Sequence, residues 1–342
     1  MSVSNNQKII RAFIRPYCEK DDRIAAASYF GSYAVFFALL FGAALSWPDL
    51  WAFVPLAMFA GLAGVRLYVL QHDCGHHSLF RTKRANDLAG HGLSLVTLTP
   101  YRAMQYNHNV HHYYVGNLDH RETGEIHTMT VAEWQAAPWW VRAGYRIYRN
   151  PAFLMLAGGI FVFFLHYRWP KSTIKAGLWK GVLAHNALLG AFVLALYGGF
   201  GWAGVWAYLV AALTAAPVGV FLVYLQHNFE DTHWGHKPEL DFAEATLEGS
   251  SCLDLGWWFD LATGCIAYHD IHHFNANIPS YRLRACHREL REIFDLPTIN
   301  WPEAIRSFTL KLWDEDQGKL VPFPKREGQQ GRGPFTRGAQ PG

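Results

Sequence analysis

The stretch WAFVPLAMFAGLAGVRLYVLQHDCGHH, residues 51–77, joins a long apolar segment to a cluster of histidines. Residues 51–70 carry only one charge, on Arg66. An α-helix of this length spans the roughly 30 Å hydrocarbon core of a bilayer. His72, His76 and His77 follow at once. The stretch therefore predicts a transmembrane helix that ends in a group of imidazoles.

Three further segments have the same character, at 27–46, 181–200 and 202–225, and none contains a charged residue. Together with 51–71 they form two pairs, each joined by a short turn without Lys or Arg. A buried helix of a soluble protein is seldom so uniformly apolar. We predict an all-α integral membrane fold with four transmembrane helices in two hairpins, interfacial helices, and a helical cytosolic domain that caps them.

Basic residues flank the ends of the hairpins away from their turns, which places both termini and the long central segment in the cytosol. They are Arg81, Lys83, Arg84, Arg142, Arg146, Arg149, Arg168, Lys171, Lys175 and Lys180. Residues 88–99 are too short to cross, and residues 152–167 are borderline. We interpret 152–167 as an interfacial or re-entrant element, with a further crossing pair as the alternative.

The expected organisation has three parts. Residues 1–26 form a cytosolic N-terminal segment, and residues 27–324 form the membrane domain, with its cap at 72–180 and 226–324. The tail at 325–342 is rich in Gly, Gln and Arg, which predicts disorder. The net charge of +3 and the low charged fraction of 17% exclude a nucleic-acid-binding profile.

The histidines recur in boxes: HDCGHH at 72–77, HNVHH at 108–112 and HDIHH at 269–273, with a lone histidine at the end of the fourth span. Positions i, i+3 and i+4 share one face of a helix, so each box presents its imidazoles in one direction. The predicted topology brings all four groups to the same side of the membrane. The candidate metal ligands are His72, His76, His77, His108, His111, His112, His227, His269, His272 and His273, of which eight or nine could bind.

Nine imidazoles exceed the coordination of one ion, whereas two ions with four or five nitrogen ligands each fit the count. Open coordination positions suit a redox metal better than structural zinc. The carboxylate-bridged di-iron pattern needs two Glu-x-x-His motifs, and only residues 230–233 match. Iron–sulfur ligation is excluded because the chain has no Cys-x-x-Cys.

At these residues the chain resembles the membrane fatty-acid desaturase family, and the stretches NLDHRETGEIHTMTVAEW, YRIYRNP and YLQHNFEDTHW resemble its bacterial acyl-lipid members. The resemblance implies two non-haem irons held by nine of these histidines, all except His77, which is the alternative to His76 in the first box. It leaves Gln226 and Asn228 open as further ligands. Asp73, Asp231 and Asp270 are candidates to accept a hydrogen bond from the ring nitrogen of a ligand histidine that does not bind metal. Such a hydrogen bond fixes the tautomer of the histidine.

The resemblance further implies a fatty-acyl desaturase of the bacterial inner membrane that uses O2 and two electrons on the acyl chain of a membrane glycerolipid. The sequence has no flavin or nicotinamide fingerprint and no ferredoxin-type cysteine spacing, so a ferredoxin, flavodoxin or cytochrome must supply electrons. Arg81, Lys83 and Arg84 could attract an acidic donor, but positive-inside topology is the favoured explanation for them. The alternatives are a di-iron hydroxylase and a non-enzymatic membrane metal or haem carrier.

Overall fold

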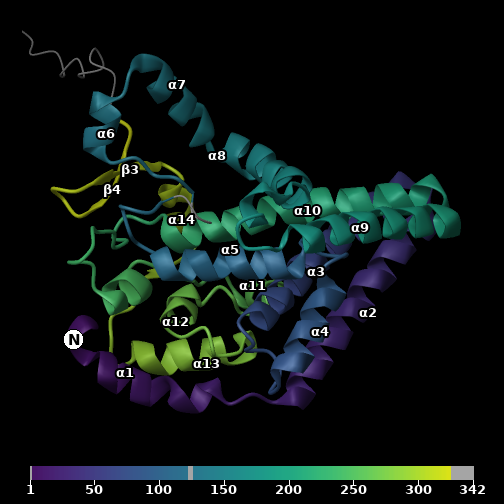
Figure 1. Cartoon of the computed structure of the whole chain (residues 1–342), viewed down its shortest axis with the longest axis horizontal. Helices are drawn as coiled ribbons and strands as arrows, with labels where there is room; N and C mark the ends of the chain where they lie inside the picture. Colours follow the sequence, from purple (N-terminus) through teal and green to yellow (C-terminus); the bar gives the residue numbers. More distant parts are fainter. Residues whose placement is uncertain (1, 122–125, 325–342) are drawn as a thin grey trace, which may run out of the picture.

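The fold is a bundle of long helices with a cap at one end, seen in a computed structural model that describes residues 2–121 and 126–324 (Figure 1). The long helices are α2 (Asp22–Ser46), α3 (Leu50–Gly75), α9 (Trp179–Phe200) and α10 (Trp202–His227). Each contains the whole of one predicted span, and α2–α3 and α9–α10 form the two predicted hairpins. The predicted all-α membrane fold is confirmed, while the tail at 325–342 lies outside the described residues.

Local signals in the sequence set the ends of these helices. The Asp21 carboxylate accepts the backbone N–H groups of Arg23 and Ile24 at the start of α2, and Asp49 caps α3 in the same way. Gly201 lies between α9 and α10 with φ +60°, a backbone conformation that favours glycine. Large apolar side chains on the outer faces, such as those of Phe30 and Leu194, are exposed, as expected for surfaces that contact lipid.

Helices α3 and α10 pack closely at the centre of the bundle. A Cβ atom on Gly61 would lie 2.5 Å from the backbone oxygen of Ala211, so only glycine allows this approach. Both helices end in candidate ligands, His72 and His76 on α3 and His227 on α10, and His269 of the cap interacts electrostatically with all three.

A fifth apolar stretch, Pro151–Arg168, comprises α8 (Pro151–Phe153) and the π- and 3-10-helical turns that follow. By length and hydropathy it is one of five stretches in the described part of the chain that could cross a membrane. Arg149, just before it, bonds Asn228 beyond the end of α10, and Arg168 bonds His185 in the second turn of α9. Both ends thus lie toward the open end of the α9–α10 hairpin, which agrees with an interfacial or re-entrant element.

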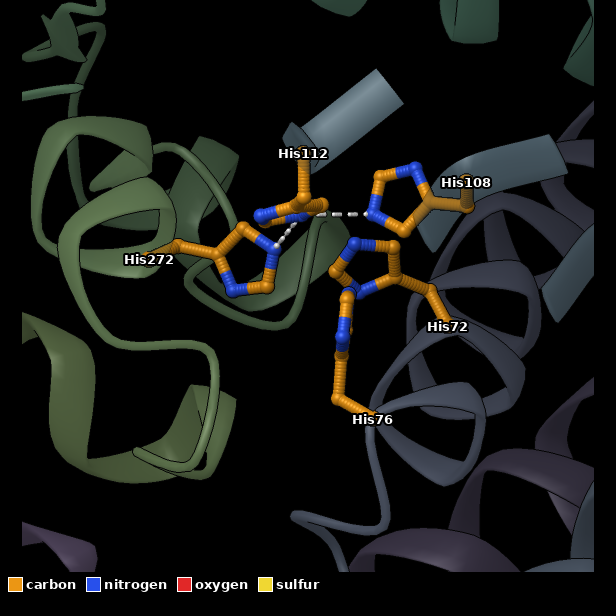
Figure 2. Close-up of side chains that lie close together, drawn as sticks. All are labelled: His72, His76, His108, His112 and His272. Atoms are coloured by element: carbon orange, nitrogen blue, oxygen red, sulfur yellow. Dashed lines mark hydrogen bonds between the residues drawn. The ribbon is translucent and has the colours of Figure 1, made fainter. Parts of the chain in front are cut away.

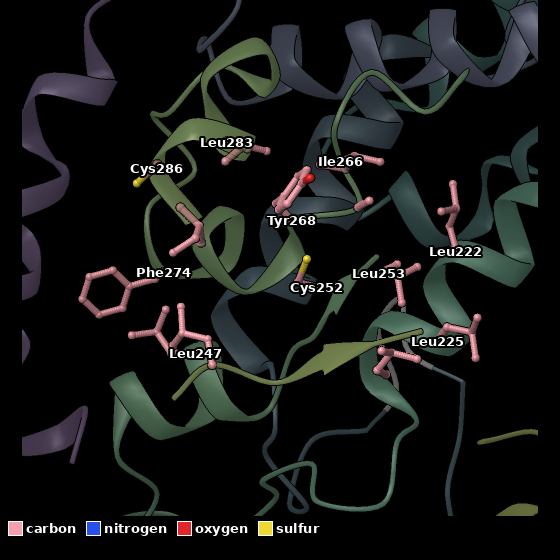
Figure 3. Packing of buried hydrophobic residues seen from close by; sticks show 14 of the residues in the cluster. Leu222, Leu225, Leu247, Cys252, Leu253, Ile266, Tyr268, Phe274, Leu283 and Cys286 are labelled. Carbon is pink, nitrogen blue, oxygen red and sulfur yellow. The ribbon is translucent and has the colours of Figure 1, made fainter. Parts of the chain in front are cut away.

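The cap contains the shorter helices. They are α1 (Gln7–Ile14), α4 (Lys83–Leu93), α5 (Tyr101–Tyr114), α6 (Val131–Ala136), α7 (Trp139–Tyr148), α11 (Trp257–Ala262), α12 (His269–Phe274), α13 (Ser280–Arg291) and α14 (Trp301–Ser307). It also holds two small sheets that the sequence did not predict: β1 (Cys252–Leu253) beside β2 (Thr298–Ile299), and β3 (Leu310–Asp314) beside β4 (Lys319–Pro322). Its core joins the end of α10 to β1, α12 and α13, with Leu225, Leu253 and Phe274 buried (Figure 3). The core thus attaches the third histidine box to the spans.

Candidate metal centre

Nine histidines converge where the cap meets the long helices, and they fall into two groups. The first is the five-histidine group, His72, His76, His108, His112 and His272 (Figure 2). The second is the four-histidine group, His111, His227, His269 and His273. Within each group the ligand nitrogens all lie within 4.8 Å of one another. The structure therefore brings together all nine residues that the sequence selected.

The helical period explains how two boxes serve both groups. On α5, His108 and His112 are one turn apart and face the five-histidine group, whereas His111 faces the other. On α12 the division is reversed: His269 and His273 face the four-histidine group, and His272 the other. Two neighbouring sites therefore share two helices.

The spacing of the nitrogens fits metal ions. Metal–imidazole bonds of about 2.1 Å place two nitrogens on one ion about 3.0–3.4 Å apart. In the five-histidine group the Nε2 atom of His112 lies 2.9 Å from that of His108 and 3.0 Å from that of His272. In the four-histidine group the Nε2 atoms of His269 and His273 are 2.9 Å apart. These separations lie close to the lower limit of the range that a shared ion sets.

Burial keeps the imidazoles in the form that binds metals. Desolvation and neighbouring histidines lower the pKa of His108, His112 and His272 well below the usual value, and those of His269 and His273 likewise. These rings are therefore neutral at pH 7, as metal ligation requires. Among the residues that the structure describes, several buried ring nitrogens have no hydrogen-bond partner, including the Nε2 atoms of His72, His76 and His227. Unpaired buried nitrogens are costly, and metal ions would satisfy them.

The sequence left open whether His76 or His77 is a ligand and whether Gln226 and Asn228 are further ligands, and these residues lie in different surroundings. His76 lies in the five-histidine group, whereas the Nε2 atom of His77 lies 3.0 Å from Asp87 on α4. The Gln226 amide donates to the carbonyl of Ile266. Asn228 accepts a hydrogen bond from Arg149. His76 therefore belongs to a candidate ligand group, whereas His77, Gln226 and Asn228 have other hydrogen-bond partners.

The three candidate carboxylates differ in position. Asp73 is buried, with one oxygen 3.5 Å from Nδ1 of His72 and the other accepting the backbone N–H of Ser280. Asp270 is also buried, but its partner is His287 on α13 at 2.9 Å, which ties the third box to α13. Asp231 is exposed, and the structure does not bring it to either group. Only Asp73 thus approaches a candidate ligand directly.

Two buried cationic residues, Arg149 and Lys311, lie beside the four-histidine group, and the sequence did not predict them. Arg149 is fully buried and donates to Asn228 Oδ1 at 2.7 Å and to Thr128 Oγ1 at 2.6 Å. Lys311 donates to the Arg149 carbonyl at 2.7 Å. The motif YRIYRNP contained the signal, but Arg149 was interpreted as a topology charge at the membrane surface. Its position next to Asn228 fixes the chain directly after His227.

The sequence of this chain matches a family of known proteins. Residues 46–303 match the family model described as fatty acid desaturase. The chain belongs to the fatty acid desaturase family. A fatty acid desaturase of Bacillus subtilis (strain 168) is 31% identical over 94% of this chain and 92% of its own.

Two further relatives carry more specific names. The sn-1 oleoyl-lipid 12-desaturase of Synechocystis sp. is 25% identical over 81% of this chain and 78% of its own. The sn-1 acyl-lipid omega-3 desaturase (ferredoxin) of Nostoc sp. (strain 36) is 27% identical over 80% and 77%. The present chain is thus an integral membrane member of a family of oxidoreductases, with histidine groups able to hold metal.

Proposed function

We propose that this protein inserts a double bond into the acyl chain of a membrane glycerolipid, using O2 and two electrons at two non-haem irons. The division of the nine histidines into groups of five and four carries the proposal, because each group alone can hold one ion. Both lie at the ends of helices long and apolar enough to cross a bilayer, where an acyl chain can approach. The names of the relatives support acyl lipids as the substrate class.

The irons would supply the oxidising chemistry, because no side chain can deprotonate an unactivated methylene. The five-histidine group would hold one ion and the four-histidine group the other. The protein's own side chains would bind the ions and orient the acyl chain beside them. The pair of sites is fixed by α3, α5, α10 and α12, and the four-histidine group is buried on all its members, which excludes bulk water.

Electrons would come from a separate carrier. One relative's name specifies ferredoxin, which supports a small iron–sulfur donor over a flavodoxin or a cytochrome. Arg81, Lys83 and Arg84 are exposed on the loop after the first box and at the start of α4, where an acidic carrier could dock. With both termini on the cytosolic side of a bacterial inner membrane, this loop would lie on the same side as that carrier.

Lipid analysis tests the proposal. The chain would be expressed in a host whose acyl lipids are saturated, and the lipids examined by mass spectrometry with derivatisation of double bonds. A loss of two hydrogens per acyl chain is expected. A gain of one oxygen would instead indicate a hydroxylase, and unchanged lipids with zinc in place of iron would indicate a carrier.

A matched pair of variants ties the product to the site. His272→Ala removes a member of the five-histidine group and should abolish the double bond. His236→Ala should retain it, because His236 is exposed and pairs with Asp119 and Glu315 away from both groups. Equal activity of the two variants would contradict the ligand assignment.

A further inference from the structure

Two short helices of the cap present large apolar side chains outward. Trp257, Trp258 and Leu261 on α11 are 70%, 49% and 60% exposed. Trp301 and Ile305 on α14 are 43% and 66% exposed. The rings of Trp258 and Trp301 stack with centroids 6.2 Å apart, so the two helices form one continuous patch, here called the aromatic surface.

The aromatic surface continues the surface of the spans. Trp301 lies against Phe221 of α10, with ring centroids 6.4 Å apart. At the other side, the Leu261 carbonyl accepts a hydrogen bond from the guanidinium of Arg66 on α3. Phe221 and Arg66 each precede a candidate ligand, His227 or His72, by six residues, which is about 9 Å along a helix. Helices α11 and α14 thus contact α3 and α10 about 9 Å along each helix from its candidate ligand, within stretches apolar enough to cross a membrane.

The charged residues of the two helices differ in position. Asp260, the one charged residue of α11, is buried and accepts a hydrogen bond from Tyr268. On α14, Glu303 and Arg306 are exposed; Glu303 accepts the backbone N–H of Asn300, and Arg306 pairs with Glu230. The patch is therefore aromatic and apolar on α11 and has charged residues beside it on α14, a composition that suits the boundary between lipid headgroups and acyl chains.

We propose that the aromatic surface is inserted into the bilayer and holds the third histidine box at the level of the spans. Helix α11 ends at Ala262, and the third box begins at His269 after a turn formed by residues 263–268. This turn lies on α3, where a Cβ atom on Gly264 (φ +58°) would be 3.3 Å from Val69. Lipid on one side and α3 on the other thus fix the position of α12. The proposal concerns membrane contact and does not depend on the reaction catalysed.

Tryptophan fluorescence tests the proposal in the full chain, reconstituted in phosphatidylcholine nanodiscs with and without brominated acyl chains. Bromine quenches tryptophans that touch acyl chains. The Trp257→Phe/Trp258→Phe variant should lose part of the quenched fluorescence. The matched control, Trp234→Phe/Trp313→Phe, removes two tryptophans that are 6% and 3% exposed inside the cap, so its quenched fraction should rise.

The opposite signs make the outcome decisive, because both variants replace one aromatic ring by another. If removing Trp257 and Trp258 left lipid quenching unchanged and reduced quenching by aqueous iodide, the aromatic surface would face water and the proposal would be wrong. If neither quencher reached these two rings, a protein contact such as a second copy would cover them, which also overturns it. A loss of lipid quenching would support it whether or not the protein desaturates lipids.

Discussion

Replacing Arg149 by methionine should weaken metal binding at the four-histidine group. Arg149 is buried among neutral acceptors and joins Thr128, Asn228 and the carbonyl of Leu310. Methionine fills similar space but leaves Asn228 Oδ1 without its donor. That oxygen belongs to the residue directly after His227, so the change disturbs the end of α10.

The magnitude follows from the lost contacts. An unsatisfied buried polar atom costs about 1–3 kcal/mol. The lost cation–π contact with Tyr224, at 5.3 Å, adds to this, and release of a buried charge from its desolvated site offsets part of it. A net cost of about 2 kcal/mol corresponds to about a 30-fold loss of affinity. This lies within the 10–100-fold range for residues that position metal ligands.

The assay is metal content against increasing chelator, with Mössbauer spectra to separate the two irons. The four-histidine group should release its ion at about 30-fold lower chelator, while the five-histidine group should be unchanged. Arg146→Met is the matched control, because Arg146 lies three residues earlier, in the last turn of α7, but is exposed. Asn228→Asp should retain both ions, since it pairs a carboxylate with Arg149. Equal loss of both ions, or loss in Arg146→Met, would refute the reasoning.

Three further predictions concern the first box, the helix contact and pH. His76→Ala should lose the ion of the five-histidine group, whereas His77→Ala should retain both ions, as metal analysis would show. Gly61→Val should prevent stable assembly in detergent, because its side chain would meet the α10 backbone. Gly64→Ala is the control: its Cβ atom would lie 3.6 Å from the Phe36 ring, so this variant should melt within a few degrees of the wild type. Burial and then Arg149 lower the pKa of Lys311 to about 8, so the folded state binds fewer protons than the unfolded chain above this pH. Stability should therefore rise between about pH 8 and 10, by up to about 3 kcal/mol; Lys311→Met should flatten this rise, and a flat wild-type profile would contradict the assignment.

The sequence predicted the four spans and the nine converging histidines because both depend on local patterns. A run of about 20 apolar residues has one stable solution in a bilayer, and the i, i+3, i+4 spacing fixes which imidazoles share a helix face. The same patterns could not separate His76 from His77, because both follow the same helix. The small sheets at β1–β2 and β3–β4 were missed because each strand is only two to five residues long.

Tertiary structure alone decided how the histidines divide between two sites. The spacing in HNVHH and HDIHH is the same, yet packing sends the i and i+4 members of the two boxes to different groups. It also assigned Arg149 to the interior, where a charge pattern by itself suggested the membrane surface. The sequence by itself determined that this is a helical membrane protein with a histidine-rich centre, because hydropathy and helical period act within one segment. Which residues meet across segments depended on the close contact of α3 with α10 and on the packing of the cap, and these are properties of the whole fold.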